Sequence, residues 1–413
     1  MTQPPISSAD RKDAASPLAI ILAGCILSML TFGPRGAMGF FQLPVISDHG
    51  WGRDTFGFAL AVQNLLWGLG QPFAGAVADR FGAVRVLVAG LVTYAASLVL
   101  MSVSSTPLAF NITAGVMFGF ALSGCSFNLV LAAFGKLLPP EWRAMAFGFG
   151  TASGSFGQFL FSPLSVGLID AFGWRGALYV FAGLLLVAMP LAFLLRTDGS
   201  TAATSASGEP RTGLAETLAR AFSHRSYVLL VLGFFTCGFQ LAFITVHLPA
   251  YLRDAGLSPA IGGWVVALIG LFNVLGSLSS GWLCNRMPKR YLLAIIYALR
   301  SLAILALIAL PVTPATALFF GASMGLLWLS TVPPTSSLVA LMFGTRDMAM
   351  LYGFVFFSHQ VGGFLGVWLG GIFYEAQGNY DLIWYASIAL GIASAIVNLP
   401  IEEKAAPVRV ATA

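Results

Sequence analysis

The stretch Gly75-Ala-Val-Ala-Asp79-Arg80-Phe-Gly82-Ala-Val-Arg85 separates two long apolar runs, residues 55–78 and 83–104. A short charged turn between such runs is typical of a helical hairpin that crosses a membrane twice. We expect Gly75 to allow two helices to approach closely, and Asp79 to accept hydrogen bonds from the N-terminus of a neighbouring helix. Arg80 and Arg85 should hold the turn at the cytoplasmic surface. We assign these four residues to a loop that takes part in conformational gating.

The composition indicates a membrane protein. Of the 413 residues, 58% are hydrophobic and 9% are charged, whereas soluble domains carry about 25% charged residues. The net charge is only +5, and the basic residues are scattered between apolar runs, which argues against nucleic-acid binding. The four cysteines all lie in apolar runs, so we expect neither disulfides nor a metal site, and no cofactor.

Twelve apolar runs are long enough to cross a bilayer, which takes about 20 residues each. We expect them at residues 17–46, 55–78, 83–104, 107–135, 142–169, 174–195, 226–252, 259–284, 290–311, 315–343, 348–375 and 380–400. The longest polar stretch follows the sixth run, as a linker between two six-span repeats would. The sequence therefore predicts an all-α membrane protein made of two six-helix bundles with pseudo-two-fold symmetry. Its parts are a cytosolic tail (1–16), an N-terminal bundle (17–196), a cytosolic linker (197–225), a C-terminal bundle (226–400) and a second cytosolic tail (401–413).

The lysines and arginines predict the orientation of the chain. With the N-terminus in the cytoplasm, sixteen basic residues fall in cytoplasmic segments: Arg11, Lys12, Arg80, Arg85, Lys136, Arg143, Arg196, Arg211, Arg220, Arg225, Arg286, Lys289, Arg290, Arg346, Lys404 and Arg409. Three fall on the opposite side, namely Arg53, Arg175 and Arg253. Because cytoplasmic loops carry the excess of basic residues, we expect both termini in the cytoplasm of a bacterial inner membrane.

The two remaining arginines lie inside apolar runs. Arg35 is in the first run, about 18 Å from its outer end at a rise of about 1.5 Å per residue, and Arg300 is in the ninth. No acidic residue lies where it could neutralise either guanidinium at mid-membrane. Such residues usually line a cavity with a partner or a substrate. We infer that the partner of Arg35 is a small anionic substrate such as a carboxylate, and that Pro34 and Gly36 loosen the helix beside it.

Each buried candidate also has a structural interpretation. Arg300 could instead bond backbone carbonyls of a neighbouring helix. His247 precedes the kink at Pro249, so it is either a hydrogen-bonding partner of that kink or a substrate or proton site. His359, which is followed by Gln360 in the eleventh run, is likewise either a structural residue or a substrate or proton site.

Uncharged polar side chains complete the candidate site. Most such residues form helix–helix hydrogen bonds, worth about 0.6 kcal/mol each in membranes. Trp328 comes shortly before Pro333-Pro334, and this pair predicts a broken helix of the kind used in gating. The predicted substrate-binding residues are Arg35, His247, His359, Gln63, Asn128, Trp328, Gln360 and Arg300.

Several segments resemble known membrane transporters. The 75–85 stretch resembles the loop between the second and third helices of the major facilitator superfamily. Residues 39–53, 63–68, 247–252, 297–300 and 358–362 resemble bacterial relatives of the monocarboxylate transporters, and the chain is similar to the oxalate–formate antiporters. The resemblance implies the major facilitator fold and transport of a small organic anion by alternating access, with proton symport in many members.

Two departures from these families bear on the substrate. Monocarboxylate transporters carry an Asp-xxx-Arg pair in the eighth helix, where this chain has Asn273 and Ser277. Oxalate–formate antiporters carry a lysine in the eleventh helix, in the region of His359. Either the anion-binding charge is therefore Arg35, or the substrate is not a simple monocarboxylate. Proton coupling would depend on a histidine, or on a substrate carried as its acid.

The leading prediction is a monomeric secondary transporter, embedded in the lipid bilayer, that moves a monocarboxylate-type anion together with protons. The alternative is an importer or exporter of a larger, mostly neutral aromatic compound such as a vitamin or drug, in which Arg35 is structural. An enzyme is not expected, because the sequence shows no membrane-buried acid pair, Ser/His/Asp arrangement, metal cluster or phosphate-binding loop.

Overall fold

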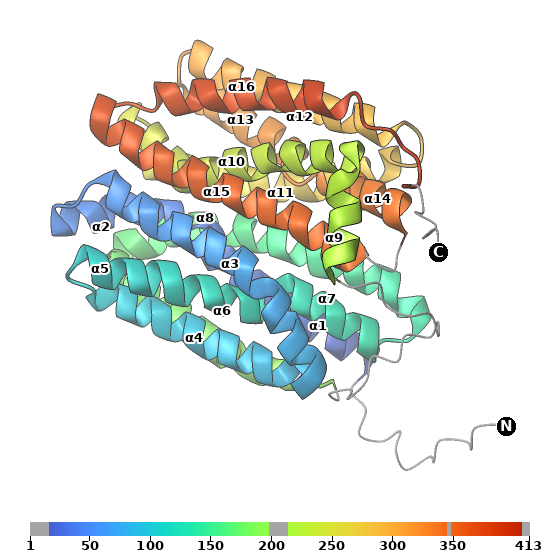
Figure 1. Ribbon diagram of the computed structural model, residues 1–413. Helices are drawn as coiled ribbons and strands as arrows, with labels where there is room; N and C mark the ends of the chain where they lie inside the picture. Colours follow the sequence, from blue (N-terminus) through green and yellow to red (C-terminus); the bar gives the residue numbers. More distant parts are fainter. Residues whose placement is uncertain (1–15, 198–213, 345–347, 407–413) are drawn as a thin grey trace.

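Long helices arranged in two groups make up the structure. The computed structural model describes residues 16–197, 214–344 and 348–406, and every regular element in this part of the chain is a helix. Figure 1 shows the N-terminal group in blue and green lying beside the C-terminal group in yellow to red. The prediction of an all-α membrane protein is confirmed.

The N-terminal half contains the first six predicted runs. Its elements are α1 (Pro17–Gly36), η1 (Met38–Phe41), α2 (Gln42–His49), α3 (Arg53–Phe81), α4 (Ala83–Val103), α5 (Pro107–Phe110), η2 (Asn111–Met117), α6 (Phe118–Cys125), α7 (Phe127–Leu137), α8 (Pro140–Ala188) and η3 (Met189–Leu195). The long α8 is really two helices, because Gly173 has a non-helical backbone with φ 69° and ψ 170°. It therefore supplies both the fifth and the sixth predicted runs.

The C-terminal half contains the other six runs. Its elements are α10 (Arg225–Asp254), α11 (Pro259–Leu283), α12 (Lys289–Ala309), α13 (Pro314–Leu327), α14 (Val332–Phe343), α15 (Met348–Gln377) and α16 (Asp381–Asn398). The short helix α9 (Leu214–Ser223) falls within the predicted linker and runs across the other helices in Figure 1. Each half has its own buried apolar cluster. The N-terminal cluster consists mainly of residues between Ile20 and Leu195, and the C-terminal cluster consists of residues between Ala221 and Ile401.

Ten stretches of described helix are long and apolar enough to cross a membrane. Helix α3 is not one of them, since Gln63, Asn64 and Gln71 make it more polar, yet it packs along α15 between the halves. With α3 counted and α8 divided at Gly173, all twelve predicted runs are helical.

The halves meet along two helix pairs, α3 with α15 and α8 with α11. We call the end of the molecule where α1 begins and α16 ends the terminal end, on the right in Figure 1, and the opposite end, where α2 ends and α3 begins, the distal end. At the distal end α15 lies so close to α3 that a Cβ on Gly371 would come within 2.7 Å of the Cα of Asp54. Only glycine permits this approach, and the halves are closed together there.

Candidate functional site

Arg35 lies at the end of α1, next to Asn64 and Trp67 of α3, which contact the C-terminal half. The helix stops one residue later, at Gly36, and continues as the 3₁₀ turn η1, so the chain is interrupted where Pro34 and Gly36 indicated. The Nη2 atom of Arg35 donates to Oδ1 of Asn64 at 2.5 Å, and its Nε is buried without a hydrogen-bond partner in the described chain. The ion pairs between described side chains do not include Arg35. Its positive charge is therefore not neutralised by a described acid.

An aromatic cluster lies on one side of this guanidinium. Its Cζ lies 4.6 Å from the centre of the Trp67 ring. Trp67 in turn has edge contacts with Phe32 of α1 and Phe356 of α15, each with ring centres 5.7 Å apart. Phe127 extends the group through Phe32, at 5.2 Å. Such rings stabilise a cation and can stack on a planar ligand.

The C-terminal half contributes a histidine to the same place. His359 stacks on Phe356, with ring centres 5.6 Å apart and planes 9° apart. One ring nitrogen, Nδ1, lies 3.1 Å from Oε1 of Gln360, and Nε2 of Gln360 donates to the backbone oxygen of Asn64 at 2.9 Å. His359 is half-buried. We refer to Arg35, Asn64, Trp67, Phe356, His359 and Gln360 as the central site.

Three predicted site residues are thus brought together, namely Arg35, His359 and Gln360. Asn128 is half-buried in the first turn of α7, directly after Phe127. Gln63 points away from the site and donates to the backbone oxygen of Ala114 at 3.3 Å, which ties α3 to η2. The predicted set of site residues did not include Asn64 or Phe356, since it is the packing of α3 on α15 that brings them into this group.

Arg300 of α12 does not belong to the central site. Its side chain contacts the break between α13 and α14, in the tenth predicted run. It is fully buried, and its Nε and Nη2 donate to the backbone oxygen of Leu327 at 3.0 and 2.7 Å. A further bond from Nη2 reaches the backbone oxygen of Trp328. These carbonyls lie at the C-terminal end of α13, where they have no N–H partner within the helix and where the helix dipole favours a cation. The contacts match the structural interpretation of Arg300.

The break itself precedes the double proline. Helix α13 ends at Leu327 and α14 begins at Val332, so Pro333 and Pro334 lie in the first turn of α14, where a missing N–H costs nothing. Asn273 of α11 supports the break by accepting from the N–H of Leu329 at 3.0 Å, and it also donates to Ser155 of α8 at 2.8 Å. This asparagine therefore links the two halves.

His247 is fully buried near the distal end. Its Nε2 lies 2.9 Å from the backbone oxygen of Val367, so Nε2 carries the proton and donates. Its Nδ1 accepts from Nε2 of Gln42 or from the hydroxyl of Tyr380, each at 3.2 Å. The expected bond to the carbonyl freed by Pro249 is replaced by these contacts, because the ring points at α15 and not along its own helix. The contact with Gln42 crosses between the halves, whereas Val367 and Tyr380 belong to the same half as His247.

An ion-pair cluster that the sequence did not reveal closes the distal end. Arg53, at the start of α3, holds the carboxylate of Asp254 with two hydrogen bonds of 2.6 and 2.8 Å. It also donates to the hydroxyl of Tyr380 at 2.8 Å and lies 3.6 Å over the Tyr374 ring. Its backbone N–H donates to Glu375 at 2.7 Å. We call Arg53, Asp254, Tyr374, Glu375 and Tyr380 the distal lock, since Arg53 belongs to one half and the others to the second.

Two expectations for the 75–85 loop are wrong. A Cβ on Gly75 would meet nothing within 4 Å, so this glycine does not mediate a close helix contact. Asp79 does not cap a helix N-terminus but pairs with Nζ of Lys136 at 2.7 Å, because the end of α7 lies beside the loop. Arg80 and Arg85 are exposed at the terminal end.

No group of three His, Cys, Asp or Glu side chains in the described ranges lies close enough to hold a metal ion. The four cysteines are free thiols. The chemistry of the central site is therefore that of a guanidinium, an imidazole, two amides and aromatic rings.

Comparison with known proteins supplies the family. The profile described as Major Facilitator Superfamily matches residues 20–366. The chain is 27% identical to YcxA of Bacillus subtilis (strain 168), described as an MFS-type transporter, over 88% of this chain and 90% of that protein. It is 23% identical to monocarboxylate transporter 13 of Rattus norvegicus (92% and 88% covered) and 25% identical to the gallate transporter of Pseudomonas putida (75% and 77% covered).

A mutant of the nucleoside transporter NupG has a similar structure, with a TM-score of 0.77 at 15% identity, covering 92% of this chain and 99% of that one. At this identity the similarity speaks for the fold alone. The family match extends over most of the chain, and the relatives are transporters and not enzymes. This chain belongs to the Major Facilitator Superfamily of membrane transporters.

Proposed function

We propose that the protein is a secondary active transporter that carries a small organic anion of the monocarboxylate type, by proton symport and alternating access. The observation that supports this best is the guanidinium of Arg35, which has no acidic partner in the described chain. A carboxylate supplies the acceptor that the protein lacks, and guanidinium binds it with two parallel hydrogen bonds.

The surroundings of Arg35 favour a carboxylate with a flat body. Trp67 lies against the guanidinium, and Phe32 and Phe356 pack on Trp67. The named relatives agree with this chemistry, since they include monocarboxylate transporters and a gallate transporter, and gallate is an aromatic carboxylate. We therefore place the carboxylate on Arg35 and the body of the substrate beside the touching rings of Trp67 and Phe356.

Proton coupling falls to His359 in this proposal. Histidine is the side chain whose charge ordinarily changes near neutral pH. His359 belongs to the half opposite Arg35. Gln360 engages its Nδ1, and the buried thiol of Cys237 is a further hydrogen-bonding neighbour of the ring. A protonated His359 attracts the same anion as Arg35, so the anion and the proton bind together and leave together.

The closed distal end fits one state of an alternating-access cycle. The distal lock holds the halves together at that end, and the contacts between them continue inward to Trp67 and Phe356. By the distribution of lysine and arginine, the terminal end faces the cytoplasm of a bacterial inner membrane, with both termini inside. We infer that the structure is the inward-facing state of a monomer.

The second candidate is transport of a larger, mostly neutral aromatic compound. The aromatic cluster beside Arg35 favours it, because its rings offer stacking surfaces and the Trp67 ring already contacts the guanidinium. In that case Arg35 orders Asn64 and Trp67 and does not touch the substrate.

Uptake into proteoliposomes tests the proposal. We would supply labelled monocarboxylates, including benzoate and gallate, under an inward proton gradient, to the wild type and to Arg35→Lys, Arg35→Ala and His359→Gln. Arg175→Ala is the matched control, since Arg175 is a distal arginine paired with Asp48 within one half.

We expect the Arg35 variants to lose carboxylate uptake, and His359→Gln to exchange the substrate without accumulating it on a proton gradient. Normal carboxylate uptake by Arg35→Ala would contradict the anion assignment. Uptake of neutral aromatic compounds alone by the wild type would support the second candidate.

A further inference from the structure

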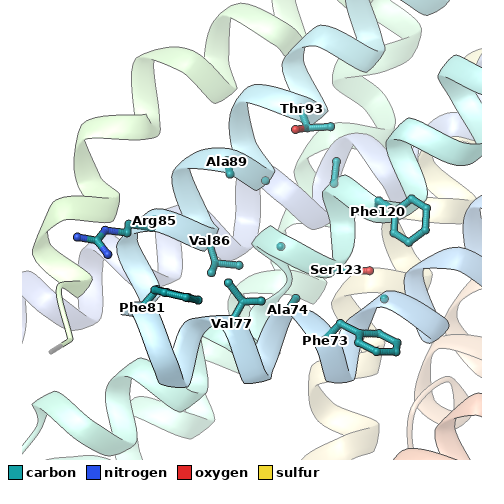
Figure 2. A pocket seen from close by; sticks show the side chains of 14 residues that line it. Phe73, Ala74, Val77, Phe81, Arg85, Val86, Ala89, Thr93, Phe120 and Ser123 are labelled. Carbon is teal, nitrogen blue, oxygen red and sulfur yellow. The ribbon is translucent and has the colours of Figure 1, made fainter. Parts of the chain in front are cut away.

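A long apolar groove runs along the outside of the N-terminal half, away from the central site. It has a volume of about 560 Å³ and is lined by residues of α3, α4 and α6. Figure 2 shows Phe73, Val77 and Phe81 of α3 on one side and Val86, Ala89 and Thr93 of α4 on the other. The rim includes the exposed rings of Phe73 (67% exposed) and Phe120 (48%). In a membrane-spanning chain, this groove opens toward lipid.

Small residues create the groove. Gly70, Gly90 and Gly124 are buried in its floor, where α3, α4 and α6 pack closely. A Cβ on Gly90 would lie 2.7 Å from the carbonyl carbon of Gly124, so a larger residue has no space there. Ala121 and Ser123 continue the floor. Large side chains therefore stand only at the rim, and the hollow between them stays open.

A second hollow, of about 420 Å³, joins the groove at the terminal end. The two share Phe81 and Arg85, and the second is also lined by Arg80 and Arg196. The end of η3 is held there because Thr197 accepts from the N–H of Ala83 at 2.9 Å. Three guanidinium groups thus meet where the apolar groove ends.

These arginines have no acidic partner in the part of the chain that the structure describes. The neighbouring acid, Asp79, is paired with Lys136 at 2.7 Å. The other described ion pairs do not include Arg80, Arg85 or Arg196. All three side chains are exposed, and guanidinium matches the geometry of phosphate.

The length of the groove agrees with one leaflet of a bilayer. From Gly70 to Phe81 the helix advances by eleven residues, or about 16 Å at about 1.5 Å per residue. Half of a hydrocarbon core about 30 Å thick is about 15 Å. An acyl chain in the groove therefore brings its headgroup to the level of the arginines.

We propose that the joined hollows bind an anionic glycerophospholipid, with its phosphate on Arg80, Arg85 and Arg196 and one acyl chain in the groove. A basic cluster beside a membrane-spanning helix attracts anionic lipid, at about fivefold in affinity per arginine. The groove adds a requirement for an acyl chain, which separates this site from a surface that merely attracts anions. The site is independent of the substrate assigned to the central site.

Native mass spectrometry of the purified full chain in detergent tests the proposal. Dioleoyl phosphatidylglycerol is titrated against dioleoyl phosphatidylcholine and against inorganic phosphate. The headgroup variant is Arg85→Gln with Arg196→Gln, and its control is Arg286→Gln, an exposed arginine of the corresponding turn in the other half that lies over Trp282 at 3.7 Å. The groove variant is Ala89→Trp, and its control is Val92→Trp, on the same helix outside the groove.

We expect the wild type to prefer phosphatidylglycerol, and the double arginine variant to bind it about 25-fold more weakly. Ala89→Trp should weaken binding of phosphatidylglycerol while both controls keep it. Equal binding of the two lipids by the wild type would overturn the proposal. So would displacement of the lipid by inorganic phosphate at similar concentration, which indicates a soluble-anion site, or an equal loss in Arg286→Gln, which indicates only general surface charge.

Discussion

Neutralising Asp254 should open the distal end of the molecule. The Asp254→Asn substitution keeps the shape of the side chain but removes the charge that Arg53 holds with two hydrogen bonds of 2.6 and 2.8 Å. These bonds join the two halves, so they exist only while the distal end is closed. Their loss lowers the stability of the closed state relative to the open one without removing a contact inside either half.

The magnitude follows from the burial of the pair. Breaking a fully buried ion pair costs about 3–5 kcal/mol, and an exposed pair contributes about 0–1 kcal/mol. The Arg53 side chain is 7% exposed and that of Asp254 is 36% exposed. We therefore expect about 2 kcal/mol, which changes the ratio of open to closed molecules about 30-fold.

Pulsed electron paramagnetic resonance measures this ratio directly. Spin labels are attached at Asp170 and Ala260, which are exposed at the distal ends of different halves, after the native cysteines are replaced by serine. The distance between the two labels reports the separation of the halves at the distal end. Asp254→Asn should add a longer-distance population. Arg175→Gln is the matched control, because its 2.7 Å pair with Asp48 lies within one half. An unchanged distance distribution in Asp254→Asn, or an equal change in Arg175→Gln, would refute the role of the distal lock.

Three further substitutions separate stability from transport. Arg300→Met leaves the carbonyls of Leu327 and Trp328 buried without their donor, so the free energy of unfolding should fall by about 3 kcal/mol. This appears as a lower thermal unfolding temperature, and Arg300→Lys should lower the temperature less. His247→Leu removes the bond to the Val367 carbonyl, so the free energy of unfolding should fall by about 2 kcal/mol, seen as a lower thermal unfolding temperature. The residual uptake should keep its pH profile. Gly371→Val places a side chain against Asp54 and should increase the longer-distance population. Unchanged distances would show that the closed contact accommodates the side chain and does not depend on glycine.

The fold was predictable because it depends on local features of the chain. Apolar runs of the right length, separated by basic turns, determine the helices, and the break before Pro333 is visible from the prolines. Arg35 and His359 were identifiable because a charged or titratable residue in an apolar run is costly. The structural role of Arg300 could be named as an alternative but not its partners, which depend on how α12 meets the end of α13.

Pairings between distant segments could not be predicted. Arg53 and Asp254 are 201 residues apart in sequence, and each looks like an ordinary residue at the end of a helix. Gly75 was misjudged for a related reason. Its motif predicts a tight turn, but which glycine touches another helix is decided by the rotation of α3, which turns Gly68 and Gly70 toward neighbours and Gly75 away.

The central site and the distal lock share two helices, α3 and α15, which gives a physical route between the proposed substrate site and the gate. Helix α15 carries Gln360 in the site and Glu375 in the lock, fifteen residues apart, or about 22 Å along the axis. Helix α3 carries their partners, Asn64 and Arg53. If each helix moves as a rigid rod, a ligand that separates Gln360 from Asn64 also strains the contact between Glu375 and Arg53. We therefore expect ligand binding at the central site and closure of the distal end to be coupled through α3 and α15, with no separate signal between the two sites.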